Sequence, residues 1–281
     1  MTIDLLHKII KVRYKLLGFS ANYTEFQECK LYWINRYCDK SDKQILFIHG
    51  LGTSSSSWVR IIPLLRVPTS IKCIDLPGHG FSKLSNHGNR FTFEQLYTIV
   101  RKFILRNQSS PVTLVGHSLG GWIALKIACE HPNAVERLVL INNAGIMCPG
   151  IEKLAETFNI KSLIDTYRLL HRMWFRYPSY FEPFTPFVYN YLLRKNINQL
   201  INSIRPSDFL NDTLDHLTMP VDIIWGENDI LIPKESIEIM KNKIPSATLH
   251  LIKECGHVPQ LEQPKRLADL LNDILYTPGK I

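Results

Sequence analysis

Short, nearly continuous apolar runs recur along the chain, and most are followed by a glycine or a polar turn. Such runs are typical of strands that are buried on both faces of a parallel sheet. Between them lie segments whose apolar residues recur every three or four positions, which predicts helices. The pattern predicts strands over residues 44–49, 71–75, 112–115, 138–142, 221–225 and 248–252, and helices over residues 92–105, 119–130, 233–243 and 264–276.

Strands that alternate with helices in this way predict an α/β fold built on a doubly wound, mostly parallel sheet. Residues 23–37 alternate in part between apolar and polar positions, which predicts a pair of strands that leads into the sheet. We expect residues 21–145 and 219–281 to form this core. In such sheets the active groups gather at the carboxyl ends of the strands. We therefore expect the catalytic residues in the turns that follow the apolar runs.

Residues 146–218 interrupt the alternation, because they follow a helical pattern and contain no convincing strand. We predict a helical cap inserted between two strands; the alternative is a set of extra core helices without a role at the site. The segment is dense in large aromatic side chains, which we expect either to wall an apolar pocket or to form ordinary core. These residues are Tyr167, Trp174, Phe175, Tyr177, Tyr180, Phe181, Phe184, Phe187, Tyr189 and Tyr191.

Residues 1–20 predict an amphipathic helix with several basic positions. Lys8, Lys11, Arg13 and Lys15 interrupt its apolar residues, so it lacks the continuous apolar run of a secretory signal peptide. The helix is expected to pack on the body of the protein; the alternative is a basic helix that lies on a membrane surface. No stretch approaches the ~20 apolar residues that span a bilayer. We therefore expect a cytoplasmic protein, with peripheral membrane contact through residues 1–20 as an open alternative.

Composition and charge narrow the classes of partner. The chain has 281 residues, of which 45% are hydrophobic and 21% are charged, as in ordinary folded domains. Its formal net charge is +8, but lysine and arginine are spread along the chain without a long basic block, so we expect no nucleic-acid partner. The six cysteines show neither the paired spacing of a metal site nor a dense disulfide framework. We expect reduced cysteines, no metal and no organic cofactor.

The sequence Gly116-His117-Ser118-Leu119-Gly120 follows one predicted strand and precedes a predicted helix. It matches the G-x-S-x-G turn, in which a sharp bend between strand and helix holds a serine in a strained conformation at its tip. Small residues on both sides let the backbone approach closely, and the helix N-terminus favours negative charge beside the serine. This context predicts that Ser118 is a nucleophile; the alternative is a serine that only caps the helix.

A serine hydroxyl is a poor nucleophile until a base accepts its proton. His257 lies in the loop between the last predicted strand and the last helix, and an imidazole with its ordinary pKa of about 6.5 suits such a base. The base needs a carboxylate that fixes its tautomer. Asp229 follows the strand at 221–225. Its rivals fit less well, because Asp222 lies within that strand and Glu227 comes too early in the turn that follows it. The order Ser118, Asp229, His257 is the one expected for this fold.

The negative oxygen of a tetrahedral intermediate needs N–H donors, each of which contributes about 2.7–4 kcal/mol in comparable sites. We expect one donor to be the N–H of Leu119, directly after the nucleophile. The second is expected from His49-Gly50-Leu51-Gly52, which follows an earlier strand, through the N–H of Leu51. The side chain of His49 is expected to brace this loop through hydrogen bonds.

Taken together, these residues resemble the α/β-hydrolase superfamily, which implies its fold and a Ser–Asp–His triad without a cofactor. Within the superfamily the chain resembles small lipases and esterases of the monoacylglycerol-lipase type. Asn142-Asn143-Ala144-Gly145, the aromatic cap and the basic N-terminus carry this finer resemblance. It implies an ester or acylglycerol-like lipid substrate and an acyl-serine intermediate. The matching stretches are His49-Gly50-Leu51-Gly52, residues 75–82, Gly116 to Gly121, Gly226 to Asp229 and Gly256-His257.

Other members of the superfamily fit less well. Ser118 argues against epoxide hydrolases and haloalkane dehalogenases, whose nucleophile is an aspartate. Hydrolases of carbon–carbon bonds often carry Gly-Pro-Gly after the first motif and a tryptophan after the histidine, where this chain has Gly52-Thr53-Ser54 and Val258. A menaquinone-pathway lyase of the same fold needs arginines near an anionic substrate. Three arginines of the predicted cap could serve: Arg168, Arg172 and Arg176.

The carbon–carbon hydrolase and the lyase remain alternatives to an esterase. Acyl transfer to an acceptor other than water also remains open, because the acyl-enzyme is common to both reactions. A non-catalytic binding protein on the same scaffold is a further alternative, although such a protein need not keep an intact triad.

Overall fold

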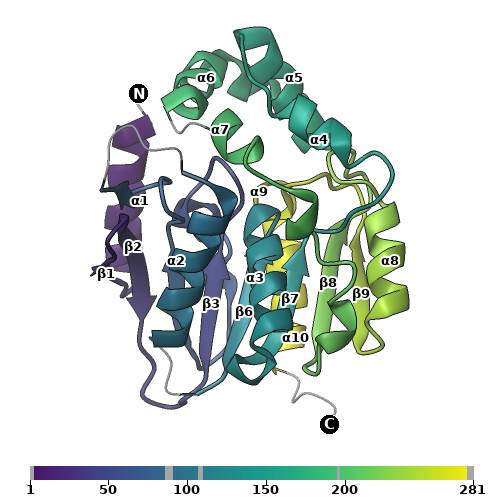
Figure 1. Ribbon diagram of the computed structural model, residues 1–281. Coiled ribbons are helices and arrows are strands. Elements are labelled where there is room, and N and C mark those ends of the chain that lie inside the picture. The colour runs from purple at the N-terminus through teal and green to yellow at the C-terminus, as the bar shows by residue number, and fades with distance from the viewer. Residues whose placement is uncertain (1–2, 86–90, 107–109, 195–196, 277–281) are drawn as a thin grey trace.

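One β-sheet forms the centre of the computed structural model, which describes residues 3–85, 91–106, 110–194 and 197–276 (Figure 1). The strand order is β1-β2-β4-β3-β6-β7-β8-β9, and the short β5 pairs with β2. The strands are β1 (Ser20–Glu25), β2 (Cys29–Arg36), β3 (Gln44–Ile48), β4 (Ser70–Ile74), β5 (Lys83–Leu84), β6 (Val112–His117), β7 (Val135–Ile141), β8 (Val221–Gly226) and β9 (Ala247–Ile252).

The strands from β4 to β9 along this order are parallel, whereas β1, β2 and β5 pair in antiparallel fashion. Every residue of β6 and β8 is buried, as expected for strands that are covered on both faces. The mostly parallel α/β fold predicted from the sequence is therefore confirmed. Register pairs Ile48 with Gly116, His117 with Ile141 and Ile141 with Ile224, so the carboxyl ends of four neighbouring strands meet at one edge.

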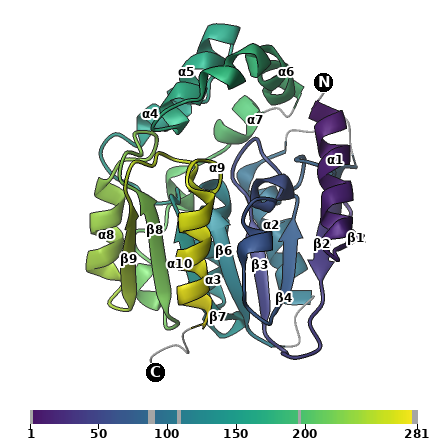
Figure 2. The same cartoon turned by 180° about the vertical axis from the view of Figure 1, so that it is seen from behind.

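Helices cover both faces of the sheet (Figures 1 and 2). On one face lie α2 (Phe93–Arg106), α3 (Leu119–Glu130) and α8 (Glu235–Lys243); on the other lie α1 (Ile3–Leu16) and α10 (Pro264–Tyr276), which the short α9 (Pro259–Glu262) precedes. The buried hydrophobic residues form two separate clusters, one on each face of the sheet. Short 3-10 turns connect the elements: η1 (Ser55–Trp58), η2 (Ile62–Leu64), η3 (Pro132–Ala134), η4 (Ser179–Phe184), η5 (Pro206–Asp208) and η6 (Leu214–His216).

Helix α1 packs on the body of the protein through its inner side. Tyr14 and Phe19 are buried, and their rings contact each other with centroids 5.3 Å apart. The hydroxyl of Tyr14 also donates a hydrogen bond to the carbonyl of Ser55 at 2.7 Å. Burial of a large apolar side chain contributes about 1.5–3 kcal/mol, so α1 is part of the folded core rather than an appended segment.

Four helices lie above the carboxyl edge of the sheet, at the top of Figure 1: α4 (Glu152–Thr157), α5 (Leu163–Met173), α6 (Thr185–Arg194) and α7 (Ile197–Ile201). The inserted segment is joined to the point where the chain leaves the core, because the N–H of Leu210 binds the Gly145 carbonyl at 3.0 Å. Beside this contact the amide side chain of Asn211 bonds both the N–H and the carbonyl of Met147. We therefore keep 146–218 as the proposed extent of the cap, with its two crossings joined to each other.

The aromatic side chains of the cap do not form a common core. Tyr191 alone of the ten is buried, and five are exposed: Tyr167, Tyr180, Phe181, Phe184 and Phe187. Several contact one another; the ring of Phe181 lies 5.9 Å from Trp174 and 4.7 Å from Tyr180. The apolar residues of the cap that join the core cluster beside α2 and α3 are aliphatic for the most part, such as Ile160, Leu169 and Leu200.

Candidate active site

Ser118 occupies the tip of the turn between β6 and α3. Its backbone has φ 53° and ψ −117°, a region that non-glycine residues rarely adopt and that stores local strain. The turn is tight: a Cβ atom added to Gly116 would lie 2.5 Å from the carbonyl oxygen of Gly120, and one added to Gly120 would lie 2.3 Å from that of Ile48. The glycines on either side of the serine are therefore required by close backbone contacts.

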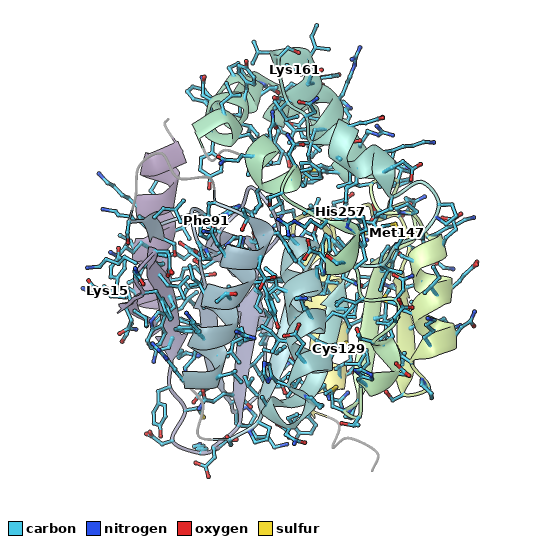
Figure 3. The ribbon with its side chains drawn as sticks, in the orientation of Figure 1. Lys15, Phe91, Cys129, Met147, Lys161 and His257 are labelled. Carbon is cyan, nitrogen blue, oxygen red and sulfur yellow. The ribbon has the colours of Figure 1, made fainter. Side chains whose placement is uncertain are left out.

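His257 connects Ser118 and Asp229, so the structure brings together the three residues that the sequence singled out. Its Nε2 lies 3.0 Å from the Ser118 Oγ, and its Nδ1 lies 2.8 Å from the Asp229 Oδ2. A carboxylate can only accept, so Nδ1–H donates to Asp229 and Nε2 is left to accept the Ser118 hydroxyl proton. The three side chains follow β6, β8 and β9, and His257 lies between the sheet and the cap (Figure 3).

The side chain of Asp229 is fully buried, with 0% exposure. Its Oδ1 accepts the N–H groups of Leu231 and Ile232 at 2.8 and 3.2 Å. Burial is the largest influence on its pKa and raises it, but the charge of His257 and the hydrogen bonds from His257, Asn142 and Leu231 together hold the pKa below its usual range. Asp229 is therefore ionised beside the imidazole.

The two rival carboxylates lie elsewhere. Asp222 is within β8, where it pairs with Arg137 at 2.5 Å and His250 at 2.9 Å. Glu227 is exposed at the start of the turn. Neither is the partner of His257 in the structure.

The loop after β3 passes directly beside the serine. A Cβ atom added to Gly50 would lie 3.1 Å from the Ser118 Cβ, which places the following Leu51 at the edge of the site. Leu119 is the first residue of α3, where the N–H has no acceptor within the helix. His49 braces the loop: its Nε2 accepts the Leu76 N–H at 2.9 Å and its Nδ1 binds the Gly50 carbonyl at 2.8 Å. The roles of Leu51 and Leu119 as oxyanion donors remain predictions.

Asn142 is a member of the site that the sequence did not identify. Its Nδ2 donates to the Asp229 Oδ2 at 2.7 Å, and its Oδ1 accepts the Gly226 N–H at 3.3 Å. The residue has φ 41°, which asparagine tolerates better than most side chains. An asparagine cannot supply the carboxylate of a triad, but its position after β7 allows its amide to bind the carboxylate after β8.

His117 is a second residue whose role at the site the sequence did not identify. It is buried behind His257, where its Nε2 lies 2.8 Å from the His257 carbonyl and its Nδ1 lies 3.3 Å from the Gln260 Nε2. An Nε2–H tautomer satisfies both contacts, because it donates to the carbonyl and accepts from the amide. Burial, followed by the neighbouring charge of His257, lowers the pKa of His117 to about 3. The ring is therefore neutral, and it holds the backbone of His257 in place.

The structure shows no alternative centre based on a metal or a disulfide in the ranges it describes. Within those ranges, no three His, Cys, Asp or Glu side chains are grouped as a metal site, and the six cysteines are free. In the same part of the chain, no helix is both long and apolar enough to cross a membrane.

Comparison with known proteins agrees with the fold. A model described as the alpha/beta hydrolase family matches residues 45–270. Monoacylglycerol lipase abhd6-A of Xenopus laevis is 24% identical over 294 residues, which cover 95% of this chain and 86% of that protein.

Solved structures with similar folds include enzymes of different names. A membrane phospholipase A, described as a bacterial virulence factor, matches with a TM-score of 0.84 at 24% identity, over 98% of this chain and 91% of that one. A meta-cleavage product hydrolase from Pseudomonas fluorescens matches with a TM-score of 0.74 at 20% identity, over 88% and 94% of the two chains. At these identities the structural likeness shows the fold alone.

The Asn142 side chain should influence the reactivity of Ser118 through Asp229. Asn142→Ala removes a hydrogen bond to a buried carboxylate, which contributes about 1.5–3 kcal/mol. The rate at which a fluorophosphonate labels Ser118 should fall roughly 10- to 100-fold. Asn143→Ala is the matched control, because Asn143 is equally buried but bonds Ala144 and Met240 instead of the triad. Equal labelling rates for both variants would contradict the role of Asn142.

The buried neutral His117 should make folding stability depend on pH. Between its folded pKa of about 3 and an unfolded value near 6.5, only the unfolded chain binds the extra proton, so the free energy of unfolding falls as the pH is lowered through this window. His117→Gln removes this titration. From pH 7 to pH 5 the wild type should lose about 2 kcal/mol more stability than the variant in urea unfolding. The exposed His216→Gln control should keep the wild-type dependence, and an H117Q slope equal to the wild-type slope would refute the assignment.

Proposed function

This chain belongs to the alpha/beta hydrolase family, and we propose that it hydrolyses carboxylic esters through an acyl-serine intermediate. Ser118 is the nucleophile, His257 is the base and Asp229 orients the base. The observation that carries the proposal is the continuous contact from Ser118 Oγ through the His257 ring to a buried Asp229 carboxylate, at 3.0 and 2.8 Å. Residues with these three roles can activate a serine without any further group.

In the first half of the proposed reaction the His257 Nε2 takes the Ser118 proton while Oγ attacks the ester carbonyl. The carbonyl oxygen becomes negative, and the N–H groups of Leu51 and Leu119 stabilise it. Asp229 stabilises the imidazolium without taking its proton. The intermediate then collapses, the alcohol leaves with the proton from His257, and an acyl-serine remains.

In the second half a water molecule replaces the alcohol. His257 removes a proton from this water, which attacks the acyl carbonyl, and the same two N–H groups stabilise the second tetrahedral intermediate. Its collapse releases the carboxylic acid and returns the proton to Ser118. The strained backbone of Ser118 keeps Oγ at the tip of the turn in both halves.

The proposed substrate is an ester with a lipid-like acyl chain, such as an acylglycerol. Support comes from the names of relatives: a monoacylglycerol lipase aligns along most of the chain, and a phospholipase A shares the fold. A carbon–carbon hydrolase remains the second candidate, because a meta-cleavage product hydrolase shares the fold as well.

The arginines that favoured a lyase are not gathered at one place. Arg168 and Arg172 are exposed and line a cleft between α4 and α5, together with Lys153 and the acidic Glu156 and Asp165. Arg176 is exposed and lies 3.8 Å from Glu254. The acidic side chains offset part of the positive charge, which weakens the case for a site for an anionic substrate.

We also propose that α1 contacts membranes at its outer side, in a protein of the cytoplasm. Ile9, Val12 and Leu16 are exposed by 50%, 59% and 83%, and their spacing of three and four residues places them on one side of the helix. Lys8, Arg13 and Lys15 are exposed near this apolar stripe and suit an anionic surface. The fourth basic residue, Lys11, instead lies over the rings of Tyr32 and Phe81, 5.9 and 5.6 Å from their centroids.

Hydrolysis of p-nitrophenyl esters from acetate to palmitate tests the chemistry, with the wild type beside Ser118→Ala. Loss of a triad nucleophile costs on the order of 10⁶ in rate. We expect the wild type to hydrolyse the series and the variant to be inactive. The preferred acyl-chain length of the substrate then gives the length of the site that binds the acyl chain.

Two other outcomes would change the proposal. If the wild type is inactive on every ester while a fluorophosphonate labels Ser118, the nucleophile stands and the carbon–carbon hydrolase becomes the better candidate. If nothing labels Ser118, the catalytic assignment itself is wrong.

Point substitutions on α1 test membrane contact better than deletion of residues 1–20, because deletion would also remove the buried Tyr14 and Phe19. The triple variant Ile9→Ser, Val12→Ser, Leu16→Ser should lower partitioning onto vesicles that contain phosphatidylserine by at least about 10-fold. Leu251→Ser, at another exposed leucine, should leave it unchanged. If wild type and triple variant partition equally in a sedimentation assay, α1 is not the contact.

A further inference from the structure

One half-buried carboxylate joins the cap to the loop that carries His257. Glu262, at the end of α9, accepts the Gly256 N–H with Oε1 at 2.9 Å and the Phe175 N–H with Oε2 at 2.7 Å. Gly256 directly precedes His257, whereas Phe175 lies just beyond α5 in the cap, 87 positions from Glu262. Each oxygen of the carboxylate thus holds the backbone of a different segment.

The same junction contains a direct contact to the base. The His257 N–H donates to the Met173 carbonyl, the last residue of α5, at 2.8 Å. Gly256 lets the two backbones approach closely, because a Cβ atom there would lie 2.6 Å from the Phe175 nitrogen and 2.8 Å from the Trp174 carbonyl carbon. The end of α5 therefore rests on the two residues Gly256 and His257.

The chemistry of the junction requires a carboxylate. Both oxygens of an ionised carboxylate accept, so Glu262 can bind two N–H donors at once. An amide keeps one accepting oxygen and turns an NH₂ donor toward the second N–H. Burial raises the pKa of Glu262, and the N–H groups of Phe175, Gly256 and Val258 oppose this rise because they favour the ionised carboxylate.

We propose that Glu262 is a positioning residue, which fixes the cap and the His257 loop to each other and so sets the placement of the base against Ser118. This role rests on the proposed function of His257. A displacement of about 1 Å at a reacting group can reduce the rate about 100-fold, so a contact to the adjacent backbone is close enough to matter. Movement of the cap on substrate binding is transmitted to His257 through this carboxylate.

Glu262→Gln is the primary test, and Glu254→Gln is its matched control. Glu254 links the same two segments through an exposed pair with Arg176, at 69% and 80% side-chain exposure, and its substitution removes the same charge. Surface pairs of this kind contribute little. Gly256→Ala is a second variant, because its added methyl group pushes the cap backbone away while Glu262 stays intact.

Three readouts should be measured on the full chain. The fluorophosphonate labelling rate of Ser118 and kcat for p-nitrophenyl acetate should each fall about 10- to 100-fold in E262Q, with KM changed less than about threefold. Amide hydrogen exchange should accelerate in residues 173–176 and 254–258 together and stay unchanged in β6, which shows that the core is folded. E254Q should match the wild type within about twofold, and E262Q and G256A should combine non-additively.

Two outcomes would overturn the proposal. Unchanged exchange in both segments of E262Q would show that the carboxylate does not join them. Faster exchange with unchanged labelling and kcat would show that the junction is structural and does not position the base. If the wild type itself neither hydrolyses esters nor labels, the proposed function fails and the positioning role fails with it; exchange then reports only whether Glu262 joins the two segments.

Discussion

The fully buried carboxylate of Asp229 is the constraint on which the arrangement of the site depends. An isolated charge without water costs many kcal/mol, so it persists only where donors surround it. Its donors are the His257 ring, the Asn142 amide and the N–H groups of Leu231 and Ile232. They come from three chain segments that follow β7, β8 and β9. The strand ends must therefore lie level to within a hydrogen-bond length, and a shift of the sheet register would leave the charge unpaired.

The parallel sheet meets this requirement because neighbouring strands run in one direction and end together. Ser118 follows β6, and its N–H binds the Ile141 carbonyl at the end of β7 at 3.0 Å. Asn142, the next residue along β7, binds the Ile224 carbonyl of β8 through its N–H at 3.0 Å. Backbone bonds that end the sheet thus also position the polar side chains, and the energy of sheet pairing fixes the geometry of the triad.

The sequence was sufficient for features that depend on local pattern and failed for those that depend on contacts between distant segments. Apolar runs predicted the central strands, and the turn around Ser118 predicted its strained tip, because both are encoded within a few residues. The role of Asn142 beside the triad was overlooked, although the residue belongs to the stretch that carries the resemblance to lipases, because only the fold places its amide against Asp229. The cap aromatics show the same limit: the density of aromatic residues does not specify the direction of their side chains, and Tyr180 and Phe184 are exposed rather than part of a core.

His257 shows how tightly these distant contacts are combined, because its four polar groups are held by residues of three different segments. Its Nδ1 binds Asp229, its Nε2 meets Ser118, its carbonyl accepts from His117, and its N–H donates to Met173 of the cap. His117 ends β6 and Ser118 follows it, Asp229 lies in the turn after β8, and Met173 belongs to the inserted helices. Any displacement of the cap therefore acts on the backbone of the base itself. The inserted helices and the backbone of His257 are therefore held in one arrangement, because the same hydrogen bond ends α5 and fixes the loop that carries the imidazole.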